Sequence, residues 1–304
     1  MSDIILHHYD VSPFSQKVRR MLAFKELPWR GVTIANTLPK PLLVPLTGGY
    51  RRTPVLQIGA DIYCDSRLIT AKLDELQPSP ALVPESSRGQ IEILSDWSES
   101  RAFWWTLLPI FADLMPILPD EFVADRVSML ASLTREQVQA DAPHAFDQFQ
   151  FVLDNLERIL SQQPFMVGTS FTSADAACSH TLLYTVHSPR VYAAVQQRPR
   201  VAAWLERVNA VGVERCEEMS AEEALDIACT ANPVDIAPYL DDFIQDVSLG
   251  DAVVVQPDDY GCVPVTGTLA RATRTELVIL RESATLGRTA VHFPRLGFKM
   301  TRQP

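Results

Sequence analysis

Residues 4–25, IILHHYDVSPFSQKVRRMLAFK, hold the signals for a strand, a tight turn and a helix in direct succession. The apolar run of residues 4–9 predicts a short buried strand. Ser12 can accept a hydrogen bond from a free N–H of the first helical turn, and Pro13 at the first helical position loses no bond. Apolar side chains then recur at helical spacing at Phe14, Val18, Met21 and Leu22. This stretch predicts the start of an α/β domain.

The remaining elements of this domain are predicted before residue 77. Residues 29–34 form a strand candidate, and the prolines between residues 39 and 45 leave room for only a short helix. Two short strands, 55–58 and 62–64, flank a Gly59-Ala60-Asp61 turn as in a hairpin. Asp65 can cap a helix over residues 66–76. The expected order is β-α-β-(α)-β-β-α.

The sequence after residue 80 changes to long helical patterns. The breaker-rich segment Gln77-Pro78-Ser79-Pro80 predicts a linker, so the first domain is expected to span residues 1–77. Helices are predicted over residues 86–109, 120–139, 144–161 and 199–213, within an all-helical domain of residues 86–225. Thr172 and Asp175 have capping-box spacing, which predicts a structural role for both.

The last part of the chain is divided by charge. Residues 217–259 contain twelve acidic residues and no Lys or Arg, whereas residues 261–304 contain seven basic and two acidic residues. Neutralisation of the basic part by the acidic part is therefore expected. Four short β-like runs separated by Gly and Pro, over residues 253–255, 263–269, 276–280 and 290–293, predict a small, barrel-like β-rich extension spanning residues 235–304.

Composition narrows the partners. The formal net charge of -10 opposes attraction to nucleic acid or to an anionic membrane. Five scattered cysteines without CxxC spacing favour a reducing, cytoplasmic location and no zinc site. Residues 1–10 lack the pattern of a secretory signal. The most apolar stretch, residues 102–119, carries Asp113 and three prolines, so it is interpreted as a bent, buried helix rather than a membrane span.

Several short motifs, in this order and spacing, resemble the cytosolic glutathione transferases, most closely the serine-using tau, zeta and related bacterial types. The resemblance covers residues 4–76 and about 86–215. It rests on the segments Ser12-Pro13-Phe14-Ser15-Gln16-Lys17-Val18-Arg19, Arg52-Thr53-Pro54-Val55-Leu56, Asp65-Ser66, Phe165-Met166-Val167-Gly168 with Phe171-Thr172-Ser173-Ala174-Asp175, and Arg198-Pro199 with Trp204. It implies a thioredoxin-like glutathione-binding domain followed by an all-helical domain.

The resemblance also implies a site for glutathione as co-substrate, without a metal. The proline matching Pro54 is cis in the family and exposes the backbone of the preceding residue, here Thr53, to the cysteinyl unit. Asp65 and Ser66 correspond to the residues that hold the γ-glutamyl end. Arg52 is placed for the glycine carboxylate, with Lys40 as a second candidate, and the family helix containing Trp104 and Trp105 lines the pocket of a hydrophobic electrophile. The implied substrate-binding set is Phe14, Arg52, Thr53, Pro54, Asp65, Ser66, Trp104 and Trp105.

Ser12 is the candidate catalytic residue. A hydroxyl donor and the positive end of the following helix both favour a thiolate over a thiol. Ser15, one turn along, is an alternative. A purely structural role stays open for each site residue: Ser12 and Asp65-Ser66 as helix caps, Arg52 as a solvated cation, and Trp104 and Trp105 as core.

Three hypotheses about function follow. The first is a glutathione transferase that joins the thiolate to a small hydrophobic electrophile, and the family implies a homodimer. The second is a binding or regulatory protein that keeps the fold and acts through residues 235–304. The third, a thiol-disulfide reductase, is disfavoured because position 12 is serine rather than cysteine.

Overall fold

The structure is a computed structural model that describes residues 3–244 and 246–303. The chain forms two compact units. One comprises Met1–Ser15, Pro28–Ile69 and Arg215–Pro304, and the other comprises Gln16–Leu27 and Thr70–Glu214. The C-terminal residues belong to the same compact unit as the first strands. The predicted domain boundaries at residues 77, 86, 225 and 235 therefore stay predictions.

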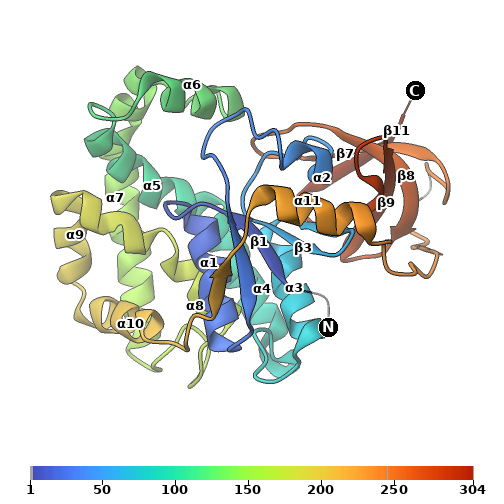
Figure 1. The fold of residues 1–304 in the computed structure, drawn as a ribbon. Helices are drawn as coiled ribbons and strands as arrows, with labels where there is room; N and C mark the ends of the chain where they lie inside the picture. The colour runs from blue at the N-terminus through green and yellow to red at the C-terminus, as the bar shows by residue number, and fades with distance from the viewer. Residues whose placement is uncertain (1–2, 245, 304) are drawn as a thin grey trace. The chain divides into compact units, whose positions relative to one another are not determined.

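The expected thioredoxin-like order is confirmed at the N-terminus (Figure 1). The central strand β1 pairs in parallel with β2 and antiparallel with β3, which in turn pairs antiparallel with β4. The elements are β1 (Ile5–His8), α1 (Pro13–Phe24), β2 (Trp29–Thr33), α2 (Val44–Thr47), β3 (Val55–Ile58), β4 (Asp61–Cys64) and α3 (Ser66–Leu76).

The C-terminal part continues this sheet instead of forming a module of its own. Its elements are β5 (Cys216–Glu218), α11 (Ala221–Thr230), β6 (Tyr239–Leu240), β7 (Ala252–Pro257), β8 (Val265–Ala272), β9 (Glu276–Ser283), β10 (Gly287–Pro294) and β11 (Phe298–Arg302). Strand β10 pairs in parallel with β4, and β5 pairs with β2 at the other edge, so the described residues form one sheet of eleven strands. The predicted β-rich extension is thus confirmed, and it is built as an open continuation of the thioredoxin-like sheet. The strands β5, β6 and β11 and the helix α11 were not predicted.

One hydrophobic core joins the extension to the first strands. Leu46, Tyr50 and Ile62 of the N-terminal part are buried in the same cluster as Ile279 and Phe293 of the extension. The ring of Tyr50 contacts that of Phe293 edge-on, with 6.1 Å between the ring centres. Since burial of each large apolar side chain contributes about 1.5–3 kcal/mol, the two parts stabilise one another.

The second unit is helical. Its elements are η1 (Glu85–Ser87), α4 (Arg88–Glu99), α5 (Arg101–Leu114), α6 (Asp120–Met129), α7 (Arg135–Leu160), α8 (Ser173–Ser179), η2 (Leu182–His187), α9 (Pro189–Gln196) and α10 (Pro199–Asn209). The helix predicted over residues 86–109 is divided at Ser100, whose ψ of -94° is not helical. Helix α7 begins nine residues earlier than the predicted start at 144, at Arg135, and Pro143 lies inside it. In the described part of the chain, no helix is long and apolar enough to cross a membrane.

The predicted capping box of Thr172 and Asp175 is present and has a larger role than a cap. The buried Asp175 carboxylate also accepts hydrogen bonds from the Met166 N–H at 2.7 Å and from the Trp204 indole N–H at 2.9 Å. We expect Asp175→Ala to lower the free energy of unfolding by about 2–4 kcal/mol, because several buried donors lose their acceptor. In chemical denaturation, the free energy of unfolding of Asp175→Asn should lie between those of the unsubstituted protein and Asp175→Ala. A loss below about 0.5 kcal/mol in the alanine variant would contradict this assignment.

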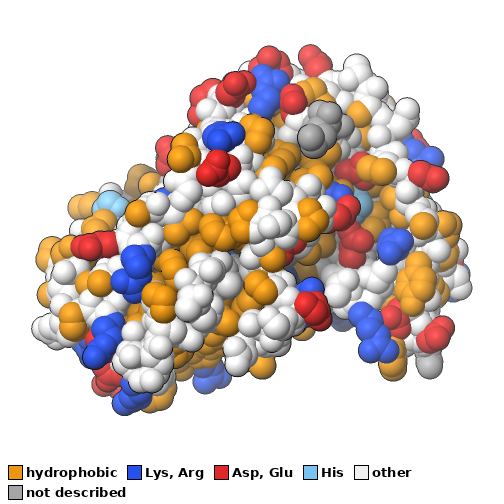
Figure 2. Space-filling model, turned by 90° about the horizontal axis from the view of Figure 1, so that it is seen from below, with side chains coloured by type: hydrophobic (Ala, Val, Ile, Leu, Met, Phe, Trp, Pro, Cys, Tyr) orange, Lys and Arg blue, Asp and Glu red, His pale blue; other side chains and the backbone are white. Residues whose placement is uncertain are grey.

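Acidic and basic side chains of the extension pair with one another, as the charge division predicts. Arg302 contacts Asp251 at 3.1 Å, and Arg274 contacts Asp241 at 3.4 Å. Figure 2 shows Lys and Arg side chains beside Asp and Glu over one face of the molecule.

Candidate functional site

Ser12 lies in the turn between β1 and α1 and is almost fully buried. Its backbone N–H donates to the Tyr9 carbonyl at 3.1 Å, and its hydroxyl oxygen accepts the Ser15 N–H at 3.2 Å. The hydroxyl is therefore the helix cap, as the structural alternative proposes. A hydroxyl that accepts still has a proton to donate, so capping is compatible with donation to a thiolate. The Ser15 hydroxyl is buried and has no partner among the described residues.

The peptide bond between Thr53 and Pro54 is cis, which confirms the prediction for this position. Lys40 lies beside it: its ammonium donates to the Thr53 hydroxyl at 3.1 Å and to the Arg51 carbonyl at 3.3 Å. The same ammonium lies 5.7 Å from the centre of the Tyr9 ring. A buried cation therefore stands next to the backbone that the resemblance assigns to the peptide thiol.

Asp65 and Ser66 form the turn from β4 into α3. Asp65 has a φ of 79°, a conformation that Asp tolerates better than most residues. Its side chain accepts the Arg67 N–H at 2.9 Å, and its carbonyl accepts the Ile69 N–H at 3.1 Å. Asp65 thus caps α3, and the buried Ser66 begins that helix, where the partial positive charge of the N-terminus suits a carboxylate.

Arg52 is not the solvated cation of the structural alternative. Its side chain is 10% exposed and donates to the Asp259 carboxylate and to the Tyr260 carbonyl. The Tyr260 ring lies against the guanidinium, with 3.9 Å between the ring centre and Cζ of Arg52. Burial lowers the pKa of Arg52, but Tyr260, Tyr50 and Asp259 more than offset this and raise it above its ordinary value. Sequence reasoning missed Asp259 and Tyr260, which follow β7 more than 200 residues along the chain and belong to no motif.

The predicted aromatic residues Trp104 and Trp105 lie on α5, in the helical unit. Trp104 packs beside a core cluster that includes Val123 and Val138, and its ring meets Phe103 edge-on at 5.0 Å. Trp105 is partly exposed and carries the Arg101 guanidinium 5.7 Å from its ring. Trp104 fits the core alternative, and Trp105 is not a member of that cluster.

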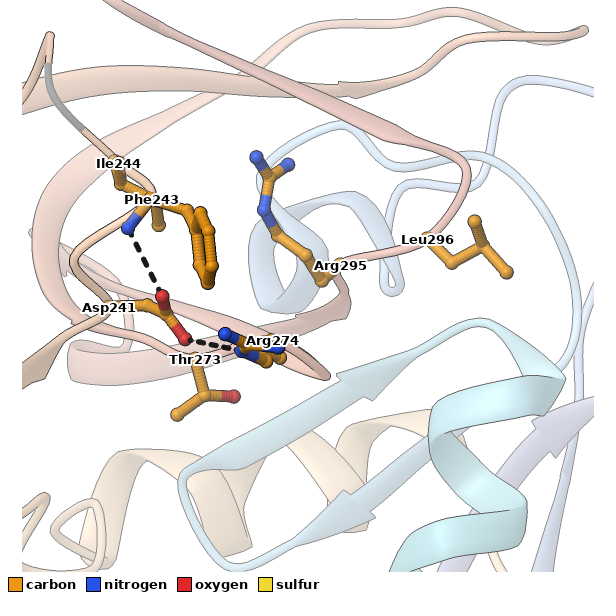
Figure 3. A pocket seen from close by; sticks show the side chains of 7 residues that line it. All are labelled: Asp241, Phe243, Ile244, Thr273, Arg274, Arg295 and Leu296. Carbon is orange, nitrogen blue, oxygen red and sulfur yellow. Dashed lines mark hydrogen bonds and ion pairs between the residues drawn. The ribbon is translucent and has the colours of Figure 1, made fainter. Parts of the chain in front are cut away.

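A separate pocket in the extension holds none of these residues (Figure 3). Its volume is about 310 Å³, and it is lined by Asp241, Phe243, Ile244, Thr273, Arg274, Arg295 and Leu296. The Asp241 carboxylate is occupied by Arg274 at 3.4 Å and by the Phe243 N–H at 3.2 Å. Arg274 also lies 4.3 Å from the Phe243 ring. Because Asp241 and Arg274 pair with each other and Arg295 donates to the Phe298 carbonyl at 3.3 Å, the pocket is a weaker candidate than the Ser12 region.

Two family models match the chain. Residues 6–81 match the glutathione S-transferase N-terminal domain, and residues 105–211 match the C-terminal domain of the same family. Among proteins with curated functions, none matches this chain. In the described residues, no group of three or more His, Cys, Asp or Glu side chains could hold a metal ion.

Solved structures agree with these matches. A GST-like protein from Pseudomonas syringae is 36% identical with a TM-score of 0.78, and the comparison covers 99% of this chain and 100% of that one. Poplar glutathione transferase F1 is 16% identical with a TM-score of 0.55, covering 75% of this chain and 98% of that one. The β-etherase LigF from Sphingobium sp. is 19% identical with a TM-score of 0.56, covering 69% and 96%. These two share the fold.

The chain belongs to the glutathione S-transferase family, whose members use glutathione as co-substrate. The P. syringae protein matches nearly the whole chain, including the extension. The poplar and Sphingobium proteins match over almost their full length, but they cover only 75% and 69% of this chain. The tau- or zeta-like subtype stays a prediction.

Proposed function

We propose that this protein joins the thiolate of glutathione to a small hydrophobic electrophile, with the Ser12 hydroxyl donating a hydrogen bond to the sulfur. The observation that carries the proposal is the buried Ser12 hydroxyl at the start of α1, which accepts a backbone N–H and keeps its own proton. In the reaction the sulfur lone pair forms a C–S bond, and the electron pair of the bond that breaks leaves with the leaving group.

The other predicted residues receive binding roles in this proposal. The backbone of Thr53 beside Pro54 would pair with the cysteinyl unit, and the start of α3 at Ser66 would hold the γ-glutamyl carboxylate. Asp65 would meet the amino group, and Phe14 lies next to the Ser12 turn in sequence. Trp104 and Trp105 stay candidates for residues that contact the electrophile. We also propose that the protein is cytoplasmic and forms a homodimer. Light scattering of the purified protein would test the dimer.

The Ser12 hydroxyl can be tested by substitution. We expect Ser12→Ala to lower kcat/KM for a model electrophile about 10–100-fold, the value of one hydrogen bond to a charged group. The pH–rate profile should shift to higher pH because the bound thiol ionises less readily. Ser12→Ala also removes the cap of α1, at a cost of about 1 kcal/mol of stability.

Two control variants separate the chemical role from the structural one. Ser12→Thr keeps a hydroxyl and should restore most of the activity and the original pH profile. Ser15→Ala removes a hydroxyl that has no partner among the described residues and should change the profile little. The proposal fails if Ser12→Ala keeps the profile of the unsubstituted protein, or if Ser15→Ala alone shifts it.

The alternative, a binding or regulatory protein that acts through its extension, is favoured by one observation: residues of the extension hold Arg52. It predicts that the purified protein conjugates none of a panel of model electrophiles and that Ser12→Ala leaves biological behaviour unchanged. Measurable conjugation by the unsubstituted protein would decide for the transferase.

A further inference from the structure

The Arg52 guanidinium is held almost entirely by the segment that follows β7. Asp259 supplies a carboxylate, Tyr260 supplies a carbonyl oxygen, and the Tyr260 ring covers one face of the guanidinium. The family resemblance implies that the Arg52 guanidinium binds the glycine carboxylate of glutathione. The positive charge of Arg52 is therefore already offset by a carboxylate of the chain itself.

Both hydrogen bonds of Arg52 come from Nη2, so other donors of its guanidinium remain unused. Its Nε–H is buried and has no acceptor among the described residues. A buried donor without an acceptor is uncommon in a finished fold, since it forfeits its hydrogen bonds to water. The side chain thus offers a hydrogen bond to a ligand while its charge is satisfied by Asp259.

The Asp259 carboxylate already places a negative charge on the Arg52 guanidinium. An incoming carboxylate would need to compete with Asp259 for the same guanidinium. A neutral carbonyl oxygen could accept from Nε without that competition.

We propose that Asp259 is a specificity-determining residue, which makes this site favour thiol peptides whose end opposite the γ-glutamyl group is neutral, such as an ester or an amide, over those ending in a free carboxylate. This inference rests on the proposed binding of a glutathione-type thiol. It assigns to the C-terminal extension a direct role in choosing the thiol substrate.

The experiment compares two probes that differ only at that end: glutathione and its glycine monoethyl ester. Dissociation constants are measured by calorimetry for the full-length protein and for Asp259→Asn, which removes the charge but keeps the size. The Asp259 side chain is 56% exposed, so the substitution should leave the fold intact, and thermal unfolding checks this. Asp258→Asn is the matched control, because this exposed neighbour changes net charge equally and its side chain meets no cation in the described residues.

For the unsubstituted protein, the ester should bind at least as tightly as glutathione. In Asp259→Asn, we expect glutathione to bind about tenfold more tightly, the value of one charge-assisted hydrogen bond at a partly exposed site, while the affinity for the ester changes less than about twofold. Asp258→Asn should keep the original ratio.

Three results would overturn the inference. Equal changes for both probes in Asp259→Asn would show that the residue only shapes the loop. Weaker glutathione binding in that variant would show that Asp259 orders Arg52 for the carboxylate. The same change in Asp258→Asn would show that the effect comes from the net charge of the protein and not from Asp259. If neither probe binds any of the three proteins, the proposed function fails as well, which distinguishes that case from the others.

Discussion

A chain that ends at Val234 is expected to yield no cooperatively folded protein. The deletion removes β6 to β11, which supply most of the apolar side chains around Leu46, Tyr50 and Ile62. At about 1.5–3 kcal/mol for each large side chain, losing the burial of several on both sides exceeds the 5–15 kcal/mol that typically stabilises a folded protein. The deletion also leaves the whole edge of β4 unpaired, which favours aggregation.

This truncation would be measured by soluble yield, near-ultraviolet circular dichroism and thermal unfolding. Co-expression of residues 235–304 as a separate chain is the control, since it restores the missing strands without the covalent link. A soluble truncated chain that unfolds cooperatively and binds glutathione would show that the shared core is dispensable. The result also bears on the alternative function: activity lost on deletion cannot identify the extension as the working part, because the glutathione-binding strands would be lost with it.

Local signals in the sequence were sufficient for the N-terminal elements. The cap at Ser12 and the turn at Asp65 depend on residues within one turn, and both have the expected geometry. The cis bond before Pro54 was implied by the family resemblance, and it is present. The helix ends were less predictable. Ser100 divides one expected helix through its backbone conformation. Residues 130–134 break the helix predicted over residues 120–139, without a glycine or proline to mark the break.

Contacts between distant segments could not be predicted in this way. The parallel pairing of Ala290 with Asp61 joins strands about 230 residues apart, and its register is set by packing instead of local spacing. The contact of Asp259 with Arg52 is of the same kind: both residues are typical surface types, and only the fold brings them together. Consequently the residues that we propose to bind the thiol lie within the family motifs, while the residue that we propose to set thiol specificity lies outside every motif.

Unfolding of the protein is expected to depend on pH through His292, which joins the extension to β4. Its Nε2 lies 3.0 Å from the Asp61 carboxylate and its Nδ1 lies 2.9 Å from the Glu276 carboxylate. Only the protonated imidazole can donate to both. Burial lowers the pKa of His292, but the hydrogen bonds and charges of Asp61 and Glu276 outweigh it, so the pKa is raised above its ordinary value.

The direction of the pH effect follows from that shift. The histidine pKa in an unfolded chain is about 6.5, so the contribution of His292 is complete below that pH and is lost as the pH rises through the raised pKa of the folded state. His7 and His180 do not share this behaviour, because burial lowers the pKa of His7 to about 4 and that of His180 to about 3, and both are neutral across the same range.

Replacing His292 should therefore cost most on the acidic side of this range. We expect His292→Phe, which retains a ring beside Tyr63, to lose about 3–5 kcal/mol near pH 6, since two largely buried carboxylates lose their cation. The difference from the unsubstituted protein should narrow as the pH rises to about 8, as measured by urea denaturation at each pH. His144→Phe, at an exposed position of α7, is the control and should show no such trend. A difference that stays constant with pH would mean that His292 is neutral in the folded protein, and that packing of its ring, rather than charge, holds β10 against β4.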